Sequence, residues 1–275
     1  MKKYIQIIRP LNLLITFACI LLTAHVINKI SLTLLPIILV ILLLGSFANV
    51  INDILDAKID NENNLDRPIA TGLIPKKYAI LYSSILLLSA ICIIFYYNFN
   101  ILTKFLILFL NLPLILLYTP FFKKIPLVGN LIVSIILSMV FIVTCTYLKS
   151  SIFLILPIVI LAFLMMIIRE IVKDIADIEG DKKFGVNTLP VKYGIEKSFN
   201  VIMLFSFLLI IISCSFIIIY NLAYFISLLL LVILPLIYYL YQFNKNKTAI
   251  YCIYLAKVLK LITIFGVIVI YLASI

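Results

Sequence analysis

Nine apolar runs divide this sequence, and they constrain its fold more than any other feature. They cover residues 10–28, 35–57, 77–97, 101–118, 127–148, 152–175, 197–219, 222–243 and 249–274. A transmembrane helix needs about 20 mostly apolar residues, and each run is close to that length. Apolar residues make up 65% of the 275 residues, against about 45–50% in soluble domains. The sequence therefore excludes a soluble enzyme, a disordered chain and a peripheral protein.

The charged residues indicate membrane orientation rather than nucleic-acid binding. The net charge is +11, from 22 Lys and Arg against 11 Asp and Glu. Most basic residues fall in alternate connections, as the positive-inside rule predicts, and they form no basic stripe with interleaved aromatic residues. With the amino terminus inside, only Lys29, Lys104 and Lys149 fall in outer connections. We expect a multi-pass protein of the cell membrane with no nucleic-acid partner and no obligate protein partner.

All eleven acidic residues lie in two windows, each beginning at the inner end of an apolar run. Asp53 and Asp174 are 121 residues apart, and two further pairs of aspartates share this offset. The offset maps the first four runs onto the next four, so the repeats are parallel and both windows face one side. The sequence predicts a single all-α membrane domain over residues 1–275, with pseudo-repeats at about 10–120 and 127–243 and a ninth helix. The acids are Asp53, Asp56, Asp60, Glu62, Asp66, Glu170, Asp174, Asp177, Glu179, Asp181 and Glu196.

Three aspartates in each window are spaced three and four residues apart, which predicts one helical face. Asn49 and Asn52 extend the first face one turn deeper. Carboxylates gathered in a low-dielectric setting repel one another, so a cation is expected there. The ligands are all oxygens, which favours a hard cation such as Mg²⁺ or Mn²⁺. The two sets are Asp53, Asp56 and Asp60, and Asp174, Asp177 and Asp181.

A purely structural interpretation is that these acids form a membrane-proximal salt-bridge network. The available partners are Lys58, Arg67, Lys173 and Lys182. Two clusters with matched spacing favour a functional site instead, because ionisable residues in membrane segments are costly and usually functional.

The two motifs resemble those of the UbiA superfamily of intramembrane prenyltransferases, over nearly the full length. The first is Asn52-Asp53-x-x-Asp56-x-x-x-Asp60, and the second is Asp174-x-x-Asp177-x-x-x-Asp181. Weaker matches surround them. These are Arg9-Pro10-x-Asn12, Asp66-Arg67-Pro68-x-x-x-Gly72, Tyr118, Lys123-Lys124 and Gly129-Asn130.

The resemblance implies a bundle of nine transmembrane helices, two four-helix halves plus a ninth, around a central cavity that opens to lipid and holds a polyprenyl tail. It implies two Mg²⁺ ions, one with each motif, that clamp a diphosphate at the cytoplasmic side. An allylic cation then forms, and an acceptor attacks its C1. The six aspartates are the expected catalytic residues and, with Asn52, the metal ligands. The expected substrate contacts are Arg9, Asn12, Asn49, Arg67, Tyr118, Lys123, Lys124, Arg169 and Lys173.

The stretch from Arg169 to Asp181 is most similar to the archaeal ether-lipid branch of the family. That similarity implies transfer of a geranylgeranyl group from geranylgeranyl diphosphate to the hydroxyl of geranylgeranylglyceryl phosphate, in the membrane, with release of diphosphate. Prenylation of an aromatic acid such as 4-hydroxybenzoate, in quinone biosynthesis, is the alternative.

Two other classes fit less well. A CDP-alcohol phosphotransferase needs Asp-Gly and Ala-Arg between its first acids, whereas Asp56 is followed by Ala57-Lys58-Ile59. A membrane transporter with paired acidic sites is the non-enzyme alternative, but transporters place such charges nearer the middle of the membrane.

Overall fold

The chain is helical throughout the part that its structure, a computed structural model, describes: residues 2–63 and 66–274. It divides into two compact units. One contains Met1–Phe122 and Met139–Ile152, and the other contains Lys123–Ser138 and Phe153–Ile275. Helix α7 (Val128–Tyr147) therefore contributes its first half to the second unit and its second half to the first.

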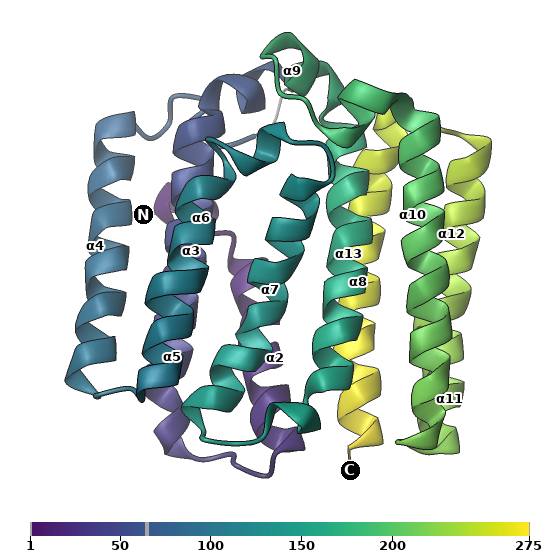
Figure 1. Cartoon of the computed structure of the whole chain (residues 1–275). Helices are drawn as coiled ribbons and strands as arrows, with labels where there is room; N and C mark the ends of the chain where they lie inside the picture. Colours follow the sequence, from purple (N-terminus) through teal and green to yellow (C-terminus); the bar gives the residue numbers. More distant parts are fainter. Residues whose placement is uncertain (1, 64–65, 275) are drawn as a thin grey trace. The chain divides into compact units, whose positions relative to one another are not determined.

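In the first unit, α3 packs against both α2 and α4 (Figure 1). Its long helices correspond to the first four apolar runs of the sequence. The elements are α1 (Lys2–Ile7), α2 (Pro10–Val26), η1 (Leu32–Leu34), α3 (Leu35–Glu62), α4 (Lys76–Tyr96), α5 (Ile101–Phe105), η2 (Leu106–Asn111) and α6 (Leu112–Tyr118), and η3 (Phe122–Lys124) begins at the unit's end.

In the second unit, α8 packs against both α10 and α13. The α8 face between them carries Ile167, Ile168 and Ile171, which are fully buried. The elements are η4 (Ile152–Leu154), at the boundary, α8 (Leu156–Ala176), α9 (Ile178–Lys183), α10 (Leu189–Ser215), η5 (Phe216–Ile218), α11 (Leu222–Leu228), η6 (Leu229–Ile233), α12 (Leu234–Lys245) and α13 (Ala249–Ala273).

Each of the nine apolar runs coincides with a helix or a continuous series of helical segments. Seven helical stretches of the described residues are long and apolar enough to cross a membrane. Helix α2, with 17 residues, is shorter than these, and α8 carries Arg169, Glu170, Lys173 and Asp174 near its end. The all-helical membrane architecture is thus confirmed, with seven rather than nine spans identified by length and apolarity.

Helix α10 begins at Leu189, earlier than the expected 197. The charged residues Lys192, Glu196 and Lys197 interrupt the apolar pattern there, which is why the sequence indicates a later start. The backbone of Gly194 leaves the helical region with φ 84°, so the first residues of α10 form a separate turn before a kink. Glycine accepts this positive φ without the steric cost that a Cβ would add.

Two spans contain a short π-helical segment immediately before a Leu-Pro pair. In the first unit η2 precedes Leu112-Pro113, and in the second unit η6 precedes Leu234-Pro235. Proline has no N–H for the usual bond to the carbonyl four residues earlier, and its ring crowds that carbonyl. The wider π turn lets the helix continue past the proline.

Tyr224 is a buried polar anchor in the second unit. Only 1% of it is exposed, and its hydroxyl donates to the Ser213 carbonyl at 2.9 Å. That carbonyl lies in the last turn of α10, where the regular helical hydrogen-bond pattern ends. The bond therefore ties α11 to the end of α10.

We predict that Tyr224→Phe lowers the free energy of unfolding by about 1 kcal/mol, because the carbonyl loses its donor while the ring stays in place. Denaturant unfolding in detergent micelles measures this change. Tyr241→Phe, on a residue that is 54% exposed, is the matched control and should leave stability unchanged. Equal stability of both variants would contradict the prediction.

Candidate active site

Asp53 lies on α3 and binds two arginines from other segments of the first unit. Only 1% of its side chain is exposed. Arg67 donates to Asp53 Oδ1 at 2.9 Å, and Arg9 donates to the same oxygen. Arg9 occupies the N-cap of α2 with a left-handed backbone (φ 55°), just before Pro10. The α1–α2 turn thus directs this guanidinium toward α3.

These three groups together carry one net positive charge, since two guanidiniums share one carboxylate. Burial lowers the pKa of the Arg9 guanidinium and the neighbouring Arg67 lowers it further, whereas Asp53 and Asp60 offset part of the effect. Arginine nevertheless remains protonated in proteins. Asp60 supplies a second anionic group that acts on the Arg9 guanidinium.

The rest of the first motif lies on the same buried face of α3. Asp56 is 4% exposed and Asp60 is 7% exposed. Asn52 accepts a hydrogen bond from the Thr119 hydroxyl at 2.9 Å, and Asn49 donates to the Ile8 carbonyl at 3.0 Å. The prediction that the three aspartates share one helical face is confirmed by this continuous helix.

The second motif is not on one helix, and the sequence prediction was wrong on this point. Helix α8 ends at Ala176, and α9 begins at Ile178. Asp177 stands between them with φ −98° and ψ 9°. Aspartate is a poor helix former, and Asp177 stands at this break. Asp181 is nevertheless buried, with 1% exposed.

Asp174 and Asp181 have partners within the second unit. Asn130, which is buried on α7, donates from Nδ2 to Asp174 Oδ2 at 2.7 Å. Lys123 Nζ lies 3.9 Å from Asp181 Oδ1. A neutral amide thus contacts the first aspartate of this motif, where two arginines contact the first aspartate of the other.

Glu170 forms a compact charged triad one turn before Asp174. Its carboxylate accepts from Arg169 at 2.8 Å and from Lys173 at 2.6 Å. Only 6% of the Glu170 side chain is exposed, against 17% for Arg169 and 34% for Lys173. The carboxylate therefore fixes two cations whose outer parts still reach the surface of the unit.

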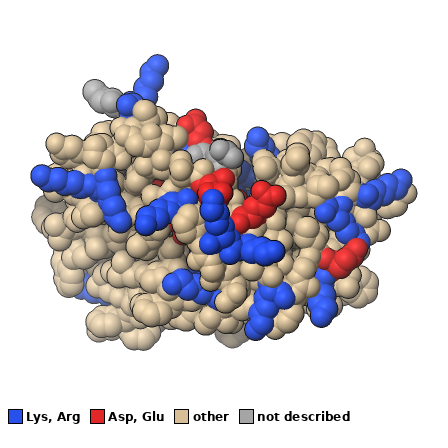
Figure 2. All heavy atoms as spheres, turned by 90° about the horizontal axis from the view of Figure 1, so that it is seen from above, with Lys and Arg blue, Asp and Glu red and all other residues tan. Residues whose placement is uncertain are grey.

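The remaining expected substrate contacts are Asn12, Tyr118 and Lys124. The Asn12 carbonyl accepts from the Thr16 hydroxyl, and Tyr118 ends α6. Lys124 is exposed in η3. In Figure 2, acidic side chains lie beside basic ones on the displayed face of the molecule.

Three polar residues in these clusters were absent from the sequence-based site: Thr119, Asn130 and Glu170. The repeat offset contains a signal for Asn130. It stands 121 residues after Arg9, and each is 44 residues before the aspartate that it binds. Thr119 and Glu170 carry no comparable signal, because their roles depend on the packing of α6 on α3 and on side-chain direction.

The motifs offer a hard cation only oxygen ligands, namely carboxylates and the Asn52 amide oxygen. Such ligands fit Mg²⁺. Among residues 2–63 and 66–274, no three His, Cys, Asp or Glu side chains gather closely enough to hold a metal ion by themselves.

Comparison with known proteins identifies the family. Residues 12–273 match the UbiA prenyltransferase family. The chain belongs to this family. It is 32% identical over 256 residues to digeranylgeranylglyceryl phosphate synthase of Methanosphaera stadtmanae, covering 91% of this chain and 92% of that protein. It is 37% identical over 220 residues to the enzyme of that name from Thermococcus sibiricus, covering 78% and 76%.

Solved structures of this family share the fold. One, from a study of digeranylgeranylglyceryl phosphate synthase in membranes, is 28% identical with a TM-score of 0.75 and covers 99% of this chain and 98% of its own. A UbiA homologue from Archaeoglobus fulgidus bound to DMAPP and Mg²⁺ is 19% identical, with a TM-score of 0.69 and coverages of 98% and 99%. The chain is therefore an integral membrane prenyltransferase, and the resemblance seen in its sequence is confirmed.

We predict that Glu170→Gln lowers the free energy of unfolding by about 2 kcal/mol, because two cations lose a buried counter-charge. Adding Lys173→Met should recover part of this loss, since it removes one of the unpaired cations. Unfolding of both variants in detergent measures the difference. A double variant no more stable than Glu170→Gln alone would contradict this account.

Proposed function

We propose that this prenyltransferase transfers a geranylgeranyl group from geranylgeranyl diphosphate to the hydroxyl of geranylgeranylglyceryl phosphate, in archaeal ether-lipid biosynthesis. The observation that carries the proposal is its similarity, over 91% of the chain, to a digeranylgeranylglyceryl phosphate synthase. Both substrates are anionic lipids, which suits a membrane enzyme whose acidic motifs are accompanied by arginine and lysine.

The basic residues beside each motif are the proposed phosphate ligands. Arg9 and Arg67 both pair with Asp53, which holds the two guanidinium groups together beside the first motif. In the second unit Glu170 holds Arg169 and Lys173 in place, and Lys123 lies beside Asp181. Guanidinium groups suit this task because their planar donor sets match phosphate oxygens. Asn12, Asn49, Tyr118 and Lys124 complete the proposed substrate contacts.

We also propose two Mg²⁺ ions, one with each aspartate motif. The carboxylates of Asp53, Asp56 and Asp60, with the Asn52 amide oxygen, would hold one ion, and those of Asp174, Asp177 and Asp181 the other. When bound, Mg²⁺ supplies Lewis-acid stabilisation of the negative charge on diphosphate. Binding of DMAPP and Mg²⁺ by the Archaeoglobus fulgidus homologue supports this choice of ion.

The residues of the chain bind and orient the reactants. The bond between C1 and the diphosphate oxygen breaks, and its electron pair leaves with the diphosphate while the allylic group becomes a cation. In this proposal Arg9 and Arg67 stabilise the departing charge, as preorganised cations do. The acceptor hydroxyl oxygen then forms a bond to C1, and its proton passes to the departing diphosphate. Holding both lipids by their tails supplies the orientation that this step needs.

The finer architecture is part of the same proposal. We propose nine spans: eight form two four-helix pseudo-repeats, and the ninth helix follows them. We also propose a prenyl-tail cavity that opens to lipid. The equal 44-residue separations of Arg9 from Asp53 and of Asn130 from Asp174 support the repeat. The positive-inside distribution supports a cell-membrane location with the motifs on the cytoplasmic side.

We predict that Asp56→Ala or Asp177→Ala lowers kcat by about 10³-fold or more, because each removes a proposed metal ligand. Product formation by purified variants in detergent measures the rate. Circular dichroism and size-exclusion chromatography check that the variants remain folded. Glu196→Ala is the control, since Glu196 is exposed and pairs with Lys247 outside both motifs, and it should keep the wild-type rate. Near-normal rates for both aspartate variants would refute the metal assignment.

The acceptor is tested by offering geranylgeranylglyceryl phosphate and 4-hydroxybenzoate in parallel, with geranylgeranyl diphosphate and Mg²⁺. We expect a prenylated glyceryl phosphate, identified by its mass, and no prenylated aromatic acid. EDTA should abolish the product, and added Mg²⁺ should restore it. Transfer to the aromatic acid alone would move the enzyme to quinone biosynthesis, and a product insensitive to EDTA would refute the role of the metal.

A further inference from the structure

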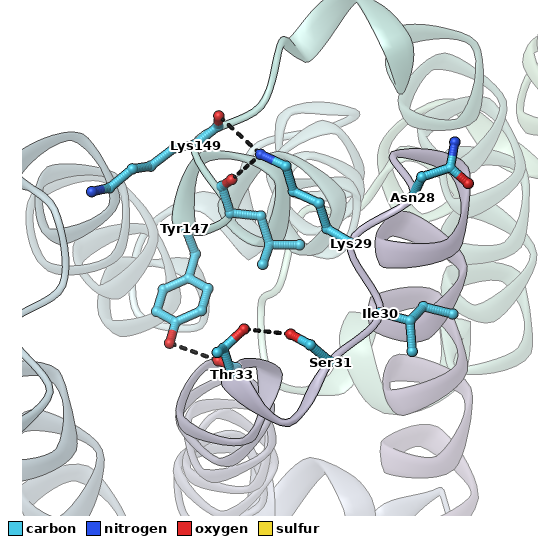
Figure 3. A pocket seen from close by; sticks show the side chains of 8 residues that line it. Asn28, Lys29, Ile30, Ser31, Thr33, Tyr147 and Lys149 are labelled. Carbon is cyan, nitrogen blue, oxygen red and sulfur yellow. Dashed lines mark hydrogen bonds between the residues drawn. The ribbon is translucent and has the colours of Figure 1, made fainter.

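A pocket with both polar and apolar lining lies in the first unit, at the end of α3 opposite to the first aspartate motif. Its volume is about 510 Å³. The α2–α3 connection forms one wall and the carboxyl end of α7 forms the other (Figure 3). Asp53 is about 27 Å away along the axis of α3, at roughly 1.5 Å per residue from Leu35. The lining residues are Asn28, Lys29, Ile30, Ser31, Thr33, Tyr147, Leu148 and Lys149.

Lys29 joins the two walls. Its ammonium donates to the Leu148 carbonyl at 2.7 Å and to the Lys149 carbonyl at 3.3 Å. These carbonyls lie just beyond the end of α7, where the helix dipole favours a cation. An ammonium group has three hydrogens, so one N–H of Lys29 remains after these two bonds.

Two hydroxyls add to the donors of the pocket. Ser31 Oγ and Thr33 Oγ1 lie 2.6 Å apart, and the Tyr147 hydroxyl donates to the Thr33 carbonyl at 2.9 Å. Because one hydroxyl of the Ser31–Thr33 pair donates to the other, the second keeps a hydrogen for a ligand. Figure 3 shows both hydroxyls at the base of the space below the Lys29 side chain. The pocket therefore presents an ammonium and a hydroxyl donor to a single ligand.

No acidic residue belongs to either wall. All eleven acids of the chain lie between residues 53 and 66 or between 170 and 196. Lys29 and Lys149 are two of the three lysines that depart from the positive-inside pattern, and Figure 3 shows the Lys149 ammonium directed away from that of Lys29. The positive charge of the pocket thus has no carboxylate of its own connections to balance it.

Apolar side chains border the same connection. Ile30 is 60% exposed, and Leu32 is 83% exposed. They stand in the connection between two apolar helices, α2 and α3. A soluble anion would use the donors and leave these side chains in water, whereas a lipid would cover both.

We propose that this pocket binds the phosphate of an anionic membrane lipid, with Lys29 and Ser31 as phosphate ligands and with Ile30 and Leu32 against the acyl chains. The bound lipid would hold the α2–α3 connection to the end of α7. This site is separate from the prenyl-transfer site and does not depend on the identity of the acceptor.

The test measures the melting temperature of the full-length protein in detergent with added phosphatidylglycerol, phosphatidylcholine or inorganic phosphate. A ligand that binds the folded state raises the melting temperature. We expect phosphatidylglycerol to raise it more than phosphatidylcholine does, and inorganic phosphate to leave it unchanged. Equal shifts with both lipids, or an equal shift with inorganic phosphate, would overturn the proposal.

Ser31→Asp places a carboxylate in the pocket and should abolish the extra shift, because it pairs with Lys29 and repels the phosphate. Asn98→Asp is the matched control: it adds the same charge beside Lys104, at the same end of the unit but outside the pocket, and should keep the shift. Lys29→Met removes the cation and should give the result of Ser31→Asp. An undiminished shift in Ser31→Asp, or the same loss in Asn98→Asp, would overturn the assignment.

Discussion

Burying carboxylates beside apolar helices is the constraint on which the rest of this structure depends. A buried charge without a partner costs several kcal/mol, so each buried aspartate needs a donor or a cation from another segment. Asp53 obtains two arginines, one from the start of α2 and one from the α3–α4 connection. The turn before α2 and the connection after α3 are thereby held against α3. The requirement of one side chain fixes three segments of the first unit.

The two aspartate motifs meet this requirement differently. Arg9 and Asn130 stand 121 residues apart, at equivalent positions of the proposed repeat, yet one is a cation and the other a neutral amide. The position of Asn49 in the first motif corresponds to Glu170 in the second. Glu170 brings a carboxylate with two cations, whereas Asn49 donates to a backbone carbonyl. If the halves arose from one ancestral unit, their charges have diverged at the positions that set the local field. Such divergence suits a reaction with two chemically different anionic substrates.

Hydropathy alone predicts most of the fold, because a membrane span must be apolar along nearly its whole length. All nine runs correspond to helices. The sequence-based predictions are wrong where the polar pattern and the helix boundaries do not coincide. The first turns of α10 are helical although Lys192 and Lys197 are charged, and the chain leaves the helix at Asp177 although the acidic spacing continues. A period of three or four residues shows which side chains share a face only while the helix is unbroken.

The acidic residues of the candidate site can be predicted from the sequence, but the residues that contact them are much harder to predict. Aspartates within apolar sequence stand out because the lipid interior strongly disfavours their charge. Thr119, by contrast, is an ordinary residue until α6 packs against α3 and brings its hydroxyl to Asn52. The pocket at the other end of α3 was equally hidden, since its walls are more than a hundred residues apart in sequence and its lysines looked like exceptions to a topology rule. Those exceptions were informative: a cation outside the positive-inside pattern needs a local partner, and Lys29 finds its own in the carbonyls at the end of α7.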